Sequence, residues 1–117
     1  MSRIKRVLLV EDNPDVSAML ADYLEDAGME AVVASSVGEA EKHFSQGKIE
    51  AILLDATLEE ENDAVPFLQR VRAYDFRGPV IGISGASASN ILLCANGANL
   101  GICKTHSREI IGALKGF

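Results

Sequence analysis

The chain has 117 residues, of which 48% are hydrophobic and 24% are charged, and its formal net charge is −6. This length is typical of one domain with its own core, so a single domain is expected over residues 1–117. The acidic charge argues against direct binding of nucleic acid, because phosphate contacts need a basic surface. No stretch has the length of a membrane span or of a signal peptide core. We therefore expect a cytoplasmic protein with Cys94 and Cys103 as reduced core residues.

Short apolar runs alternate with helical patterns along the chain. The runs cover residues 7–10, 31–34, 51–54, 79–83 and 100–103. Each is too short for a helix and fits a strand that is buried on both faces. Strands that alternate with helices predict a parallel sheet with helices on both sides, a three-layer α/β/α sandwich.

Helices are predicted between these runs from their caps and their apolar spacing. They cover residues 14–27, 36–46, 64–74, 87–96 and 107–114. Asn13 is a favourable N-cap for the first helix, and Gly28 is a typical C-terminal stop. Ser36 and Glu39 are expected to form a capping box at the start of the second helix.

Polar residues directly follow several of the runs. They are Glu11, Asp12, Asp55, Ser84 and Lys104. Because the carboxyl ends of parallel strands meet at one edge of a sheet, these side chains are expected to lie close together. Neighbouring carboxylates repel one another unless a cation is bound, and oxygen ligands alone suit Mg²⁺. A carboxylate can also accept a phosphoryl group, whose oxygens a lysine and a divalent ion then stabilise.

All of these residues except Glu11 also have an ordinary structural explanation. Asp12 could cap a helix, Asp55 could sit in a turn, and Lys104 could be a surface lysine. Their joint occurrence at the ends of the correct strands is what favours a functional site.

In this order, the segments VLLVEDNP, AILLDATL, VIGIS and GANLGICK resemble the receiver domain of two-component response regulators. The resemblance covers residues 3–114 and implies the flavodoxin-like (βα)5 fold with strand order 2-1-3-4-5. It implies that Asp55 accepts a phosphoryl group from a histidine kinase or a phosphotransfer protein. It further implies a Mg²⁺ site formed by Glu11, Asp12, Asp55 and the backbone carbonyl of Thr57. Ser84 and Lys104 would bind the phosphoryl group.

By the same resemblance, the domain would be a switch that alters the binding of a downstream protein. It would not be an enzyme, beyond self-phosphorylation and self-dephosphorylation.

Several positions depart from the family pattern. Gly101 stands where an aromatic switch residue is usual, and Thr105 stands where a proline in a cis bond usually follows the lysine. Leu58 replaces the methionine of a Met-Pro pair. The next segment, EEEND at 59–63, is acidic and one residue longer than usual, and it fits either a solvated loop or a tuned metal or kinase contact. An atypical switch is therefore expected.

The segment 78–103 contains no charged residue. The core side of its helix is predicted to carry Ala88, Ile91, Leu92 and Ala95. Leu93 and Cys94 are then partly exposed, and with Gly101 they form a candidate surface for a downstream partner or a homodimer. A wide buried face is the alternative.

Other functional classes stay open. A pseudo-receiver, an interaction module without a phospho-switch, is favoured by Leu58, Gly101 and Thr105. A Mg²⁺-dependent phosphohydrolase with Asp55 as nucleophile would lack a general acid two residues later, where Thr57 stands. A flavodoxin-like cofactor domain is disfavoured because the turn after the first run is acidic and lacks phosphate-binding glycines.

Overall fold

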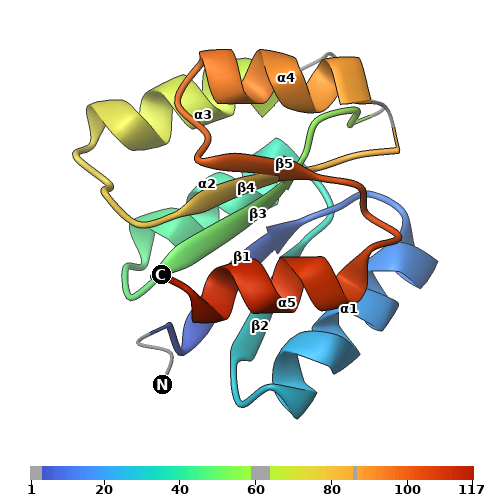
Figure 1. Cartoon of the computed structure of the whole chain (residues 1–117). Helices are drawn as coiled ribbons and strands as arrows, with labels where there is room; N and C mark the ends of the chain where they lie inside the picture. The colour runs from blue at the N-terminus through green and yellow to red at the C-terminus, as the bar shows by residue number, and fades with distance from the viewer. Residues whose placement is uncertain (1–3, 59–63, 86) are drawn as a thin grey trace.

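Parallel strands form the middle layer of the molecule in the order β2-β1-β3-β4-β5, as predicted (Figure 1). The computed structural model describes residues 4–58, 64–85 and 87–117. Its strands are β1 (Arg6–Val10), β2 (Glu30–Ala34), β3 (Ala51–Asp55), β4 (Val80–Ile83) and β5 (Leu100–Ile102). Its helices are α1 (Pro14–Asp26), α2 (Val37–Ser45), α3 (Ala64–Ala73), α4 (Ser87–Ala95) and α5 (Ser107–Lys115). The three-layer sandwich is therefore confirmed.

The sheet separates two apolar cores (Figure 1). Leu8 of β1 and Leu54 of β3 face the core under α2, α3 and α4. Leu9 and Leu53, their chain neighbours, face the core under α1 and α5. Successive side chains of a strand point to opposite faces, so a strand between two cores must be apolar at every position. This explains the apolar runs of β1, β3 and β4, which are buried throughout. The prediction of burial on both faces is wrong for β2 and β5, which lie at the edges of the sheet and are partly exposed.

The helix caps confirm one prediction and correct another. The Asn13 side chain accepts hydrogen bonds from the backbone N–H groups of Asp15 (2.9 Å) and Val16 (3.4 Å), as an N-cap does. The Ser36 hydroxyl likewise accepts from the Glu39 N–H at 3.2 Å. The Glu39 carboxylate, however, accepts from the N–H of Ser35 and not from that of Ser36. The predicted capping box is therefore wrong in one of its two hydrogen bonds: the Glu39 carboxylate accepts from residue 35 and not from residue 36.

The facing of α4 was predicted wrongly. Leu93 is only 1% exposed, whereas Ile91 and Leu92 are 69% and 55% exposed. The side chain of Ala88 lies outside the described part of the chain. Gly82 of β4 and Gly101 of β5 have no side chains, which leaves room beneath the helix. The face of the helix that carries Leu93 therefore packs against the sheet. Leu93 consequently does not belong to a partner surface.

The two cysteines were also expected in the core because of their apolar neighbours, and this is wrong, whereas the exposure expected for Cys94 on the candidate partner surface is confirmed. Cys94 is exposed and Cys103 is half-buried, and both are free thiols. Apolar neighbours in the sequence do not ensure burial here, because the outer face of α4 and the edge strand β5 remain open to solvent. Within the described ranges, no helix combines the length and apolar character needed to cross a bilayer.

Candidate functional site

Three acidic side chains meet at the carboxyl edge of the sheet. Glu11 directly follows β1, where its N–H donates to the Ala34 carbonyl at 3.0 Å, and Asp55 is the last residue of β3. One carboxylate oxygen from each of Glu11, Asp12 and Asp55 lies within 4.8 Å of the other two. Glu11 and Asp55 are each only 1% exposed. The structure thus brings together the acids that the sequence placed at the strand ends.

Lys104 joins this cluster from the residues that follow β5. Its Nζ lies 3.0 Å from Glu11 Oε1 and 3.3 Å from Asp55 Oδ2. Its backbone N–H donates to the carbonyl of Ser84, a buried residue directly after β4, at 3.4 Å. The Lys104–Thr105 peptide bond is trans. The expected ammonium group therefore contacts two of the three acids, and the ends of β4 and β5 are tied together beside it.

The two carboxylate oxygens of Asp55 have different partners. Oδ1 accepts hydrogen bonds from the Thr57 N–H (2.9 Å) and the Thr57 hydroxyl (3.0 Å). Oδ2 faces the Lys104 ammonium. The sequence assigned only a backbone role to Thr57, so its hydroxyl contact was missed. A hydroxyl residue two positions after a strand-end acid is the signal that could have indicated it.

Comparison with known proteins decides the family. The protein-family model described as the response regulator receiver domain matches residues 7–114 of the chain. The chain belongs to this family. Receiver domains are signalling switches of two-component systems, so the chain is assigned to phosphorelay signalling.

Similar proteins agree with this assignment. The chain is 28% identical over 110 residues to the transcriptional regulatory protein YxdJ of Bacillus subtilis, covering 92% of this chain and 47% of that protein. It is 27% identical over 111 residues to the CAI-1 autoinducer sensor kinase/phosphatase CqsS of Vibrio cholerae, covering 92% of this chain and 16% of that protein. The receiver domain thus spans about half of one curated relative and a small part of the other.

Solved structures share the fold. A CheY-like receiver domain from Methanospirillum hungatei has a TM-score of 0.84 at 21% identity, with 97% of this chain and 92% of that chain covered. Vibrio cholerae chemotaxis protein CheY4 has a TM-score of 0.85 at 20% identity, with 97% and 98% covered.

The acidic cluster of the receiver domain contains three carboxylates but is contacted by one lysine ammonium group among the described residues. Burial, together with the charge of Asp55, raises the pKa of Glu11 from its ordinary 4.5 to about 7, although hydrogen bonds from Asn13 and Lys104 oppose this. Burial also lowers the pKa of Lys104, but its contacts with Glu11 and Asp55 outweigh this effect and raise it overall. The ammonium stays charged, yet it does not neutralise three carboxylates.

The receiver domain's side chains fit a divalent cation. Three carboxylates and one ammonium leave two negative charges, which one divalent ion would balance. All the candidate ligand atoms are oxygens, the donors that Mg²⁺ prefers. Residues 59–63, the acidic loop expected to tune this site or contact a kinase, lie outside the described part of the chain.

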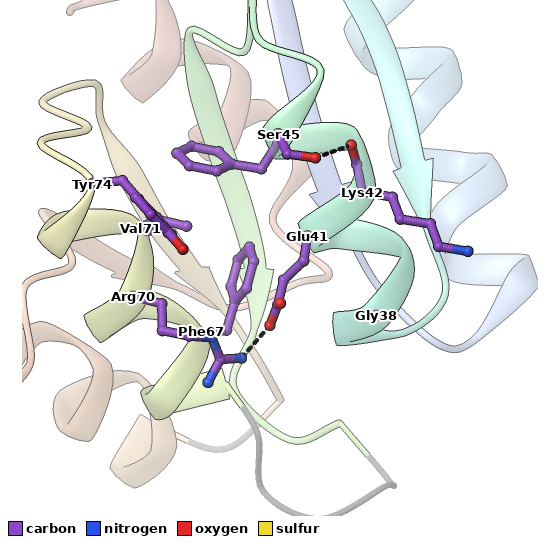
Figure 2. Close-up of a pocket in the computed structure, with 9 residues that line it drawn as sticks. Gly38, Glu41, Lys42, Ser45, Phe67, Arg70, Val71 and Tyr74 are labelled. Carbon is purple, nitrogen blue, oxygen red and sulfur yellow. Dashed lines mark hydrogen bonds and ion pairs between the residues drawn. The ribbon is translucent and has the colours of Figure 1, made fainter.

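A separate hollow of about 470 Å³ lies between α2 and α3 (Figure 2). Phe44, Phe67 and Tyr74 line it, and an ion pair between Glu41 and Arg70 crosses it. None of its lining residues belongs to the acidic cluster. The ion pair is half exposed, and such pairs contribute about 0–1 kcal/mol. This hollow and the reactive groups of the receiver domain are therefore in different places.

Proposed function

We propose that Asp55 accepts a phosphoryl group from the phosphohistidine of a histidine kinase or phosphotransfer protein. A new bond joins an Asp55 oxygen to phosphorus as the phosphorus–nitrogen bond of the donor breaks, and the imidazole leaves. The observation that carries this proposal is the meeting of Glu11, Asp12 and Asp55 within 4.8 Å, with Lys104 against two of them. We also propose that residues 1–117 form one receiver domain.

The proposed roles follow from the contacts of Asp55. Thr57 holds Oδ1 with two hydrogen bonds, which leaves Oδ2 as the oxygen assigned to the phosphoryl group. Lys104 already lies 3.3 Å from Oδ2, so its ammonium can pair with a phosphoryl oxygen after a small movement. Ser84, buried beside the Lys104 backbone, is proposed to contact the phosphoryl group as well.

We assign Mg²⁺ to Glu11, Asp12, Asp55 and the backbone carbonyl of Thr57. When bound, the ion would neutralise charge on the acids and on the incoming phosphoryl oxygens. The raised pKa of Glu11 supports this assignment, because it reflects first the burial of its carboxylate and then the nearby charge of Asp55, both of which a bound cation would offset.

The proposed output is a change in protein binding through α4 and β5. Ile91, Leu92 and Leu100 are exposed apolar side chains there, and Cys94 and Gly101 are exposed beside them. No charge interrupts the segment 78–103. Exposed apolar side chains gathered in this way are typical of contact surfaces, so a downstream partner or a second copy of the chain is the proposed occupant.

A pseudo-receiver is the second candidate function. It is favoured by the trans bond after Lys104 and by Gly101, which removes the aromatic switch. In this case the acidic cluster would have no role in signalling, and α4 and β5 would bind a partner without any phosphorylation.

Intact mass spectrometry separates these functions. The protein is incubated with Mg²⁺ and a small acyl phosphate, and one phosphate adduct is expected on the wild type and none on Asp55→Asn. No adduct, together with no effect of Mg²⁺ on stability, would leave the pseudo-receiver. Repeated hydrolysis of unrelated phosphate esters would instead indicate a phosphohydrolase.

A further inference from the structure

Two glycines leave an opening in the sheet beneath α4. Gly82 of β4 and Gly101 of β5 are direct partners in the parallel register. A Cβ atom at Gly101 would lie 2.5 Å from the Cβ of Asn90, and one at Gly82 would lie 3.0 Å from Leu93 Cδ1. Both distances are shorter than a normal contact, so α4 reaches this depth only because both strands carry glycine.

Asn90 fills this opening. The residue is only 6% exposed, and its side-chain Nδ2 donates a hydrogen bond to the Ile102 carbonyl of β5 at 3.3 Å. Its Oδ1 has no hydrogen-bond partner among the described residues and lies against Gly82. An unpaired buried amide oxygen opposes folding. A leucine would fill similar space without this cost, so packing alone does not explain the asparagine.

The position of Asn90 relates α4 to the acidic cluster. Ile102 lies two residues before Lys104, and Gly82 lies two residues before Ser84. The Lys104 N–H also donates to the Ser84 carbonyl, which joins these two strand ends. Asn90 therefore contacts both strands that lead to the proposed phosphoryl-binding residues.

We propose that Asn90 is a positioning residue that couples α4 to β5 and transmits the arrival of a phosphoryl group at Asp55 to the outer face of α4. This inference rests on the proposed function. A phosphoryl group that draws Lys104 from Glu11 moves the end of β5 and the Ile102 carbonyl. The Asn90 amide follows its acceptor, and the exposed Ile91 and Leu92 on the same helix move with it.

Nuclear magnetic resonance of the ¹⁵N-labelled protein tests the coupling. Wild type, Asn90→Leu and Asn90→Ala are compared before and after addition of Mg²⁺ and acyl phosphate, and the adduct is quantified by mass. In the wild type, the side-chain amide signals of Asn90 and the backbone signals of Leu92 and Cys94 are expected to shift. In both variants the adduct should persist, with signals at Ser84 and Lys104 still shifting, while the shifts on α4 fall at least two-fold.

Asn96→Leu is the matched control, because Asn96 lies just after α4 and bonds to Leu92 and Gln69 away from the glycine pair. It should keep the wild-type response. Wild-type α4 shifts in a folded Asn90 variant would overturn the coupling, as would unmoved Asn90 side-chain signals in the phosphorylated wild type. A wild type that takes no phosphate would overturn the proposed function itself, and the coupling with it.

Discussion

Glu11 is the residue at which burial and charge conflict most strongly. Its pKa of about 7 in the folded chain exceeds the ordinary 4.5, so the folded state binds this proton more tightly than the unfolded state does. Without divalent ions, its contribution to stability is therefore complete below pH 4.5 and lost as the pH rises through 7.

A pH series of urea unfolding in the presence of a chelator tests this. Between pH 5 and pH 8, the free energy of unfolding should fall more in wild type than in Glu11→Gln, by up to roughly 3 kcal/mol. Parallel curves for the two proteins would contradict the raised pKa.

Lys104 is the one described cation that contacts Glu11 and Asp55, and it would compete with the proposed Mg²⁺ for both. Lys104→Ala should lower the free energy of unfolding by about 1–3 kcal/mol without Mg²⁺, because two buried acids lose their partner. Added Mg²⁺ should then stabilise the variant more than it stabilises wild type. Thermal unfolding with and without Mg²⁺ measures both effects. Lys115→Ala, at an exposed lysine, is the control, and an equal Mg²⁺ effect in all three proteins would exclude competition.

Among the elements, α4 is the helix whose buried face could not be predicted from the sequence pattern. Its apolar residues allow two faces, and the predicted choice put Ile91 and Leu92 inside. The observed choice depends on Gly82 and Gly101, which become partners only through the register of β4 and β5. Such a pairing joins residues far apart in the chain, so helical spacing does not reveal it.

The fit between α4 and this glycine pair gives a prediction at the same scale. Gly101→Ala should destabilise the fold by about 1–3 kcal/mol, because the new methyl group meets Asn90 Cβ and not a flexible side-chain end. Asn90→Gly costs only about 0.3 kcal/mol in helix propensity and removes this clash. In a double-mutant cycle by urea unfolding, the double variant should be at least about 1 kcal/mol more stable than the sum of the single changes predicts. Additive effects would show that the two residues do not collide.

The strands, in contrast, were predictable. A strand between two cores is apolar throughout, and its first polar residue marks the sheet edge. This local rule placed Glu11, Asp55 and Ser84 at the ends of β1, β3 and β4, whereas Lys104 follows the partly exposed edge strand β5. It could not show which oxygen of Asp55 faces Thr57 and which faces Lys104, because these contacts depend on side-chain geometry.

For the whole molecule, the exposed apolar surface of α4 and β5 gives a prediction about assembly. If a second copy is the occupant, light scattering should show a mass that rises with concentration, and more steeply after phosphorylation. Leu92→Glu should abolish the rise, because a charge would be buried in the contact. A monomer at every concentration, with and without acyl phosphate, would exclude self-association and leave a different protein as the partner.

The acidic cluster joins distant parts of the chain. Lys104 and Glu11 are 93 positions apart, and Lys104 and Asp55 are 49 apart. During synthesis, β1 and β3 can pair long before β5 exists, so Glu11 and Asp55 come together at first without their lysine. A nascent chain that ends before residue 104 therefore carries the proposed acceptor carboxylate but not its cationic partner. The proposed phosphoryl transfer would therefore require β5 and the residues that directly follow it, which are synthesised after both acids.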